Sequence, residues 1–299
     1  MYKLYEKYMY KLIAIDLDGT LLNSYGVISE IDKDAIKKAI EKGVKVILTS
    51  GRGTMSVKNF ANELEIDGDI ICGNGAIIYN LQEDRIIYNQ YIDKKKVLQI
   101  IKICEENSIY YNVFTEDTIL TSSLAYNVLF YNQENIKKPD SKKTNINIIP
   151  NIYKYVEERE KEDYLKICIC DKNDIIFGGI MKKLKEVKNV NVMEVAHMAR
   201  KLIANGTDYV PVEYYITEIM NQDADKWNAV KFLADKYKIK TDEVITIGDN
   251  VNDEQMLKNA GIGVAMGNSA PYIKEMAKEV TLDNNSGGVA NVIEKHILK

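Results

Sequence analysis

The sequence predicts an α/β fold, in which a smaller α/β domain is inserted into a doubly wound, Rossmann-like parallel-sheet core. Between residues 11 and 92, short apolar runs alternate with segments whose apolar residues lie three and four apart, as in strand–helix–strand units. Near Asp93 this alternation gives way to a different pattern, and it resumes after Lys226. At 299 residues the chain is longer than one typical domain, and this length is consistent with two domains.

The elements of the first core segment follow from the length of each run and from the residues that end it. Apolar runs closed by glycine, asparagine or aspartate predict buried strands, and helical spacing predicts amphipathic helices. The predicted strands are Leu12–Leu17, Val44–Ser50, Ile70–Cys72, Ala76–Tyr79 and Arg85–Tyr91, and the predicted helices are Ser29–Lys42 and Met55–Leu64.

The insert begins with a predicted amphipathic helix at Lys94–Asn107. Its predicted strands are Ile109–Phe114, Thr118–Thr121, Tyr164–Cys170, Val190–Val195 and Val210–Ile216, and its second helix is Ile175–Glu186. Residues 122–163 are polar and contain the helix breakers Pro139 and Pro150. Within them we interpret only the charged run 157–163 as structured, as a solvated helix face, and residues 194–208 mostly as loop.

After Lys226 the alternation of helices and strands resumes. The predicted helices are Trp227–Lys236, Asp253–Asn259, Pro271–Ala277 and Val289–Leu298, and the predicted strands are Val244–Ile247 and Gly263–Ala265. These elements predict a discontinuous core of residues 1–92 and 213–299 and an inserted domain of residues 93–212.

The motif Asp16-Leu17-Asp18-Gly19-Thr20 follows the first predicted strand directly. In an open α/β sheet, ligands bind beyond the carboxyl ends of the strands, where these two carboxylates lie. Asp16 and Asp18 cannot separate far, so a divalent cation would keep both ionised, and a carboxylate beside such a cation is a candidate nucleophile for phosphate. Alternatively, Asp-Gly is a turn whose aspartates only cap the loop, and this motif alone favours neither interpretation.

A second acidic loop, Gly248-Asp249-Asn250-Val251-Asn252-Asp253, follows the predicted strand Val244–Ile247. Its first carboxylate, Asp249, can complete an oxygen shell together with Asp16 and the backbone carbonyl of Asp18. Mg²⁺ favours a few carboxylates together with water and phosphate oxygens. This loop therefore favours the metal interpretation of the first motif.

Two further segments place polar groups at helix starts. Thr49-Ser50-Gly51-Arg52 follows a predicted strand and offers a hydroxyl and backbone N–H groups that would cradle a phosphate. Lys226 opens the helix Trp227–Lys236, for which Asp223 and Asp225 are candidate capping residues.

In this order, Asp-x-Asp-Gly-Thr, Ser-Gly-Arg, the lysine and Gly-Asp-x-x-Asn-Asp resemble the four motifs of haloacid dehalogenase (HAD) superfamily phosphatases. Asn74-Gly75-Ala76 further resembles the Cof-type subfamily, which carries a C2-type cap between its second and third motifs. One departure is Trp227, since family members often have glycine after the third-motif lysine. The middle of the chain matches in position and length only.

The resemblance implies a Mg²⁺-dependent phosphomonoester hydrolase that acts through an aspartyl-phosphate. Asp16 would attack the phosphate ester, and Asp18 would protonate the leaving oxygen and then deprotonate the hydrolytic water. Ser50 and Lys226 would bind the transferring phosphoryl oxygens. These four residues are the implied catalytic set.

The resemblance also implies metal and substrate ligands. Asp16, Asp18 and Asp249 would hold Mg²⁺, and Asp253 would support these ligands or pair with Lys226. The implied phosphate- or substrate-binding residues are Ser50, Gly51, Arg52, Asn74, Gly75, Lys226 and Asn252. The cap would exclude water and restrict the site to small phosphorylated metabolites such as sugar phosphates. Within the cap, His197 and Arg200 are the candidates for substrate specificity.

Two other functions stay open. A phosphomutase of the same superfamily would form the same aspartyl-phosphate but pass the phosphoryl group to a second sugar hydroxyl. A non-catalytic phospho-switch or binding protein would keep the acidic cluster, although receiver-type domains, which also place acids at strand ends, are far shorter.

Composition narrows the partners and the location. A net charge of −4 and a pI near 5.5 disfavour a nucleic-acid partner, and no apolar stretch approaches membrane-spanning length. The partner that the resemblance implies is a small-molecule phosphate ester. The four cysteines lack metal-like spacing, and we interpret them as buried free thiols, which suits a cytoplasmic location. Zinc sites use several histidine or cysteine ligands, and this chain has only two histidines and no metal-like cysteine spacing, so we expect no zinc site. The oligomeric state is not predicted.

Overall fold

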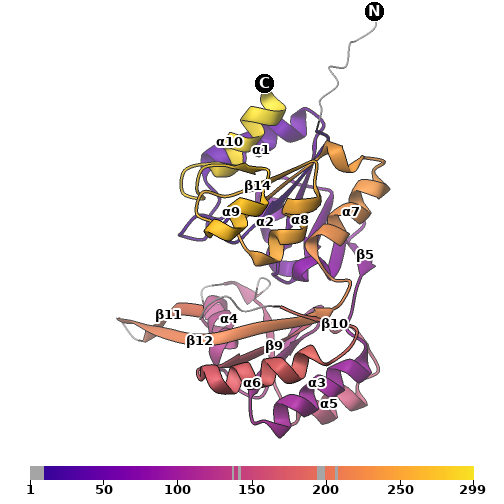
Figure 1. The fold of residues 1–299 in the computed structure, drawn as a ribbon, viewed down its shortest axis with the longest axis vertical. Coiled ribbons are helices and arrows are strands. Elements are labelled where there is room, and N and C mark those ends of the chain that lie inside the picture. Colours follow the sequence, from indigo (N-terminus) through magenta and orange to yellow (C-terminus); the bar gives the residue numbers. More distant parts are fainter. Residues whose placement is uncertain (1–9, 137, 141–142, 194–198, 206–207) are drawn as a thin grey trace, which may run out of the picture. The chain divides into compact units, whose positions relative to one another are not determined.

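The computed structural model describes residues 10–136, 138–140, 143–193, 199–205 and 208–299. The chain divides into two compact units (Figure 1). The first comprises Met1–Asn89 and Asp225–Lys299, and the second comprises Gln90–Ala224. The second unit is therefore an insert within the first, as the sequence pattern predicts.

The sheet of the first unit contains eight strands. In order across the sheet they are β15 (Glu279–Val280), β14 (Ile262–Ala265), β13 (Val244–Gly248), β1 (Leu12–Asp16), β2 (Lys45–Thr49), β3 (Asp69–Cys72), β4 (Ile77–Asn80) and β5 (Arg85–Asn89). Pairing is parallel from β15 through β3, and β4 and β5 extend the sheet as antiparallel edge strands. The predicted parallel-sheet core is thus confirmed, with a hairpin added at one edge.

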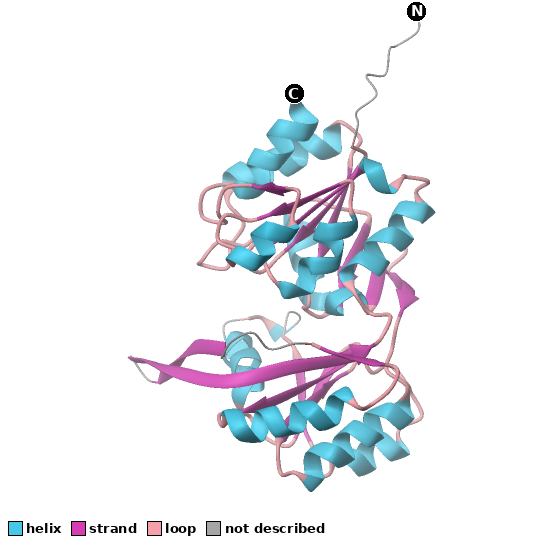
Figure 2. Cartoon of the chain, in the orientation of Figure 1, coloured by secondary structure: helices cyan, strands magenta, loops and turns pink. Residues whose placement is uncertain are grey.

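The described part of this unit has six helices, four of which join successive parallel strands (Figure 2). They are α1 (Glu30–Glu41), α2 (Thr54–Glu63), α7 (Lys226–Lys236), α8 (Glu254–Asn259), α9 (Pro271–Met276) and α10 (Gly288–Ile293). Short single-turn segments at Gly73–Gly75, Thr241–Glu243, Val251–Asp253 and Glu294–Leu298 complete the unit. Helix α1 packs against α10 (Figure 1).

The central strand β1 is buried along its whole length. Successive side chains of a strand point to opposite faces of the sheet. Leu12 and Ala14 pack on one face with Leu233 of α7, so Ile13 and Ile15 point to the other face, where they are also fully buried. Each such large apolar side chain contributes about 1.5–3 kcal/mol on burial. Because both faces of β1 are covered, apolar residues occupy successive positions, which explains the continuous apolar run in the sequence.

The insert contains a second sheet, in the order β10-β12-β9-β6-β7-β8, and β11 pairs with β12. Its strands are β6 (Tyr110–Phe114), β7 (Thr118–Thr121), β8 (Asn145–Ile148), β9 (Lys166–Asp171), β10 (Val190–Val192), β11 (Ala199–Asn205) and β12 (Asp208–Asn221). Its helices are α3 (Lys94–Glu106), α4 (Tyr126–Ile136), α5 (Ile152–Glu158) and α6 (Asp174–Lys185).

Strand β9 shows how both faces of the insert sheet are used. Ile167 and Ile169 belong to the apolar cluster formed with α3, α5 and α6. Cys168 and Cys170 therefore point to the opposite face, where the Cys170 thiol lies 3.5 Å from the side-chain oxygen of Asn127 in α4. All four cysteines of the chain are buried and free, which confirms the prediction of buried thiols.

Several predicted elements of the insert differ from the structure. The polar stretch 122–163 contains α4, β8 and α5. The α4 pattern is obscured because Asn127 is buried, where it exchanges hydrogen bonds with Asn112 instead of facing water. Helix α5 ends at Glu158, so most of the charged run 157–163 lies beyond it. The stretch 194–208, interpreted mostly as loop, contains β11.

The return to the core also differs from the prediction at residue 213. Strand β12 (Asp208–Asn221) runs through this position without interruption. Its second half pairs with β9 and β10 of the insert. Backbone hydrogen bonding therefore keeps the strand with the insert, which extends to Ala224.

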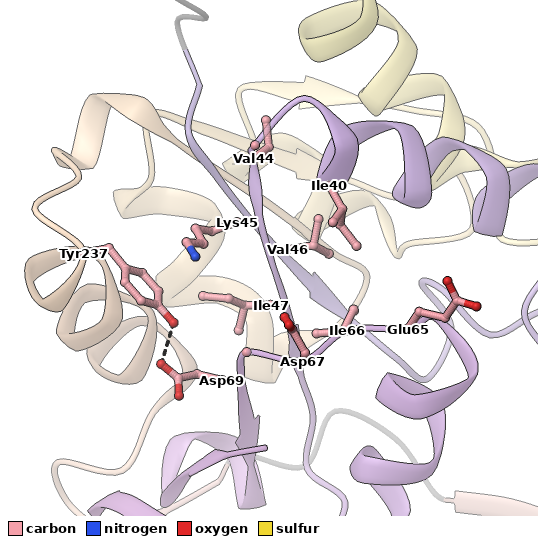
Figure 3. A pocket seen from close by; sticks show the side chains of 12 residues that line it. Ile40, Val44, Lys45, Val46, Ile47, Glu65, Ile66, Asp67, Asp69 and Tyr237 are labelled. Carbon is pink, nitrogen blue, oxygen red and sulfur yellow. Dashed lines mark hydrogen bonds between the residues drawn. The ribbon is translucent and has the colours of Figure 1, made fainter. Parts of the chain in front are cut away.

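A pocket of about 130 Å³ lies at the amino ends of β2 and β3, where the Tyr237 hydroxyl points to the carboxylate of Asp69 (Figure 3). It is lined by Ile40, Gly43, Val44, Lys45, Val46, Ile47, Glu65, Ile66, Asp67, Gly68, Asp69 and Tyr237. This end of the sheet is opposite to the carboxyl ends where ligands bind in such folds. Among the described residues, no helix has the length and apolar character needed to cross a bilayer.

Candidate active site

Asp16 lies at the carboxyl end of the central strand β1 and is buried. In register, it is opposite Thr49 of β2, and Ile15 before it is opposite Ile247 of β13. Because parallel strands end at the same edge of a sheet, the segments that follow β2 and β13 leave the sheet beside Asp16. The fold therefore gathers three of the sequence motifs at one edge.

Lys226, the first residue of α7, supplies the remaining motif, which is the third along the chain. Asp225 caps this helix by accepting a hydrogen bond from the Asn228 N–H at 2.8 Å, which confirms one of the two predicted caps. The Lys226 side chain is fully buried, and its ammonium donates to Asp16 Oδ1 and to Asp253 Oδ1, each at 2.6 Å. An isolated buried ammonium is costly, so these two carboxylates are needed to hold it.

Burial lowers the pKa of Lys226, but the charges of Asp16 and Asp253 outweigh this effect and hold the pKa above its ordinary value. Lys226 therefore stays protonated. The neighbouring Trp227 packs, partly buried, against the apolar cluster that includes Val230. The tryptophan at the position where relatives often have glycine thus faces the core, while Lys226 points to the carboxylates.

Asp253 ties the second acidic loop together. Its Oδ1 accepts from Lys226, and its Oδ2 accepts from the backbone N–H groups of Asp249 at 2.9 Å and Asn250 at 3.0 Å. A Cβ atom at Gly248 would lie 2.5 Å from the Asp253 carboxyl carbon, so glycine is required for this approach. Both oxygens of Asp253 are already engaged, which suits a supporting role.

Asp249 approaches the turn that follows β1. Its Oδ1 accepts a hydrogen bond from the Thr20 hydroxyl at 2.9 Å. Burial and the charge of Asp253 raise the pKa of Asp249 to about 6. Burial, followed by the charge of Asp253, also raises the pKa of Asp16 well above its ordinary range, although Lys226 acts in the opposite direction. Burial and mutual repulsion of negative charge therefore oppose the ionisation of both carboxylates.

Asp16, Asp249 and Asp253 can each place one oxygen within 4.8 Å of the others. A group of carboxylate oxygens is the donor set that a hard divalent cation such as Mg²⁺ prefers. The raised pKa values of Asp16 and Asp249 fit this interpretation, because a bound cation would supply the missing charge. Since Asp253 is held by Lys226 and the loop backbone, Asp16 and Asp249 are the better ligands.

Asp18 points its carboxylate to Arg52. The guanidinium donates to Asp18 Oδ2 at 2.8 Å through Nε and to Oδ1 at 2.6 Å through Nη2, a two-pronged pairing. Arg52 also donates to the Ser56 hydroxyl at 3.2 Å, and its guanidinium lies over the Phe60 ring. The side chain of Asp18 is thus oriented by Arg52, while its predicted metal contact would use the backbone carbonyl.

Ser50 and Asn252 are connected through Asn74. The Asn74 N–H donates to the Ser50 carbonyl at 2.9 Å, and the Asn252 amide donates to Asn74 Oδ1 at 3.0 Å. Asn74 has a left-handed backbone, with φ of 56°, and a Cβ atom at Gly51 would lie 2.8 Å from its side-chain oxygen. Asn74 therefore holds the second and fourth motifs together.

Gly75 meets the start of α7. It has φ of 94°, and a Cβ atom there would lie 2.0 Å from the Asp225 carbonyl oxygen. Its close contact is therefore with the backbone that presents Lys226. Of the cap candidates, His197 lies outside the described residues, and Arg200 lies on β11 opposite Glu213 of β12.

Two site residues had no role in the sequence analysis. Thr20 belongs to the first motif, and its hydroxyl holds the Asp249 carboxylate by donating a hydrogen bond to it. In the sequence, the only sign of this role is a hydroxyl side chain two residues after Asp18. The side chain of Asn268, which follows β14, donates to the Gly19 carbonyl at 2.8 Å. A contact between residues so distant in sequence has no local signature.

A family model described as haloacid dehalogenase-like hydrolase matches residues 13–293 of this chain. Among the curated relatives, the phosphatase YwpJ of Bacillus subtilis (strain 168) is 30% identical over 96% of this chain and 100% of its own length. The 5-amino-6-(5-phospho-D-ribitylamino)uracil phosphatase YwtE of the same organism is 31% identical over 95% of this chain and 97% of its own length.

Solved structures agree with these matches. A haloacid dehalogenase-like hydrolase from B. subtilis has a TM-score of 0.77 and 29% identity, covering 96% of this chain and 99% of its own. Another from Bacteroides thetaiotaomicron has a TM-score of 0.76 and 27% identity, with the same two coverages. Core and insert are both matched, and the predicted fold and family are confirmed. The chain therefore belongs to the haloacid dehalogenase-like hydrolases of the Cof type, and it is a phosphatase.

Proposed function

We propose that this phosphatase is a Mg²⁺-dependent hydrolase of small phosphomonoesters, such as sugar phosphates, that acts through an aspartyl-phosphate on Asp16. The observation that carries the proposal is the position of Asp16. Its carboxylate lies buried at the end of β1, 2.6 Å from the Lys226 ammonium and grouped with Asp249. A carboxylate held there beside fixed positive charge is suited to attack a phosphate, whose own charge would otherwise repel it.

In the first half-reaction, a carboxylate oxygen of Asp16 attacks phosphorus, and the bond between phosphorus and the ester oxygen breaks. The leaving oxygen takes a proton from the Asp18 carboxyl, so the alcohol departs and an acyl phosphate remains on Asp16. Arg52 holds the Asp18 carboxylate in the resting site and would orient it for this transfer.

In the second half-reaction, water attacks the phosphorus and gives a proton to the Asp18 carboxylate. The bond between phosphorus and the Asp16 oxygen breaks, which releases inorganic phosphate and restores Asp16 as a carboxylate. Asp18 thus alternates between acid and base within one turnover. The Lys226 ammonium and the Ser50 hydroxyl would meet the charge on the phosphoryl oxygens, a contribution of about 10²- to 10³-fold for each well-placed donor.

Asp16 and Asp249 would hold Mg²⁺, together with the Asp18 backbone carbonyl. When bound, Mg²⁺ supplies positive charge between the attacking carboxylate and the phosphate and thereby lowers the repulsion between them. The raised pKa values of Asp16 and Asp249 support this assignment, because burial and the charge of Asp253 oppose their ionisation and a bound cation would offset both effects.

The relatives support a small substrate. One of them is named for a phosphorylated ribitylaminouracil, a small metabolite. We further propose that the insert, Gln90–Ala224, selects the leaving group, with His197 and Arg200 as specificity candidates, and that the enzyme is cytoplasmic. Buried free thiols are compatible with a reducing compartment.

A screen of small phosphate esters tests the proposal, with Mg²⁺ or EDTA present and with wild type, Asp16→Asn and Asp235→Asn compared. Asp235 is an exposed aspartate of α7 that pairs with Lys231 at 3.1 Å, so it serves as the matched control. We expect turnover by wild type and Asp235→Asn with Mg²⁺, and none by Asp16→Asn. Turnover in EDTA, or by Asp16→Asn, would contradict the proposal. Isomerisation that requires a sugar bisphosphate would instead indicate a mutase.

A further inference from the structure

The turn after β1 contacts Asp249 at two points. The Thr20 hydroxyl donates to Asp249 Oδ1 at 2.9 Å. Gly19, with φ of +83°, lies so close that a Cβ atom there would be 2.3 Å from Asp249 Oδ2. The position of this turn therefore limits where the Asp249 carboxylate can lie.

The turn is held from outside by Asn268, which lies between β14 and α9. The Asn268 side-chain amide donates to the Gly19 carbonyl at 2.8 Å, and its side-chain oxygen accepts from the Asn284 N–H at 3.1 Å. Asn268 thereby bridges the turn after β1 and the segment that follows β15. Helix α9 itself has Ala270 as its N-cap, with no side-chain hydrogen bond, so Asn268 does not cap it.

Asn284 provides a second connection to the same turn. Its buried side chain donates to the Leu22 carbonyl at 2.8 Å. The Gly267 N–H donates to the Leu282 carbonyl at 2.9 Å, which joins the two outer segments to each other. The turn is therefore anchored near both of its ends, at Gly19 and at Leu22.

We propose that Asn268 is a positioning residue of the metal site: its amide fixes Gly19, and through Gly19 it fixes the carboxylate of Asp249. The inference rests on the proposed function, because it assigns Asp249 to the bound Mg²⁺. The side-chain hydrogen bonds of Asn268 join it to Gly19 and Asn284, and not to the proposed metal ligands. Its effect would pass through one backbone carbonyl and one close van der Waals contact.

The test compares Asn268→Ala and Asn268→Ser with Asn285→Ala. Asn285 follows β15, next to Asn284, and is a matched control because it is also exposed and also holds the chain after β1 from outside. It accepts from the Ser24 N–H at 3.0 Å, beyond the part of the turn that touches Asp249. Mg²⁺ alone is titrated into each metal-free protein by calorimetry. The activity at saturating Mg²⁺ and the unfolding temperature of each metal-free protein are measured in parallel.

We expect both Asn268 variants to raise the Mg²⁺ dissociation constant about three- to tenfold, the size of one lost neutral hydrogen bond, while the substrate KM at saturating Mg²⁺ stays as in wild type. Asn285→Ala should bind Mg²⁺ as wild type does. Unchanged Mg²⁺ affinity in the Asn268 variants would overturn the inference, and so would an equal loss in Asn285→Ala. If wild type binds Mg²⁺ but hydrolyses no ester, the proposed function fails while the titration still decides the role of Asn268.

Discussion

The Lys226 ammonium lies 2.6 Å from the Asp16 carboxylate, although the two residues are 210 positions apart in the chain. The whole insert, Gln90–Ala224, lies between them in sequence. The pairing therefore depends on the two parts of the discontinuous core coming together, with β1 beside β13 and α7 packed over them. Formation of this buried pair couples completion of the fold to assembly of the site.

Replacing Lys226 with methionine should both inactivate and destabilise the enzyme. The substitution removes the ammonium and leaves Asp16 and Asp253 buried without their shared cation. Loss of one partner of a buried ion pair costs about 3–5 kcal/mol of unfolding free energy. Urea unfolding at pH 7 measures this loss.

The control for this substitution is Lys231→Met on the same helix. Lys231 pairs with Asp235 at 3.1 Å, and both side chains are mostly exposed. An exposed pair contributes about 0–1 kcal/mol, so this variant should unfold nearly as wild type does and stay active. Similar destabilisation by both substitutions would show that the buried pair has no special importance.

Gly19→Ala should weaken Mg²⁺ binding. A Cβ atom at this position would lie 2.3 Å from an Asp249 oxygen, so the carboxylate must move. Gly26 is the matched control, because it also has a left-handed backbone, with φ of +74°, but a Cβ atom there meets nothing within 4 Å. Both variants carry the backbone strain, and only Gly19→Ala carries the clash. Equal Mg²⁺ affinities of the two variants by calorimetry would refute the assignment of Asp249 to the metal.

The affinity for Mg²⁺ should fall in acid. Burial and the charge of Asp253 raise the pKa of Asp249 to about 6, above its ordinary value of 3.8. As the pH falls through 6, a proton occupies this carboxyl and competes with the cation, so affinity should drop by up to about tenfold for each pH unit below 6. Calorimetric titrations with Mg²⁺ from pH 5 to pH 8 check this expectation. An affinity that is flat down to pH 5 would contradict it.

Arg52→Lys should lower kcat more than it raises KM. Lysine keeps the positive charge but cannot make the two-pronged contact that Arg52 makes with both oxygens of Asp18. If this contact orients the proton donor, the expected loss in kcat is about tenfold or more, within the range of general acid–base catalysis. Steady-state kinetics on the best ester found in the screen measure both constants. A rise in KM alone would instead place Arg52 in substrate binding.

The sequence predicted the core well because its signals are local. The buried strand β1 reads as a continuous apolar run, and the turns after β1, β2 and β13 carry their polar residues within a few positions. Parallel strands have their carboxyl ends at the same edge of the sheet, so the motifs that follow β1, β2 and β13 were expected to lie at one edge. Lys226 was identified as a helix start because Asp225 is an ordinary N-cap residue.

The remaining features depend on contacts that leave no local pattern. Asn127 occupies a buried position of α4 because it pairs with Asn112 of β6, so the helix appears more polar than its environment. The end of the insert was misplaced because β12 carries no break in its sequence where the chain was expected to return to the core. The link from Asn268 to Gly19 spans 249 positions and depends on tertiary structure alone.

The most direct test of the account is to identify the residue that carries the phosphoryl group. Asp18→Asn lacks both the acid of the first half-reaction and the base of the second. Mixed with Mg²⁺ and an ester whose leaving group needs no proton, such as p-nitrophenyl phosphate, it should form the acyl phosphate and fail to hydrolyse it, so the acyl phosphate accumulates. Borohydride reduction converts such an acyl phosphate to homoserine, which mass spectrometry locates in the peptide. We predict homoserine at position 16 and at no other aspartate. An unmodified Asp16 in enzyme that still hydrolyses the ester, or reduction at another aspartate, would contradict the central claim.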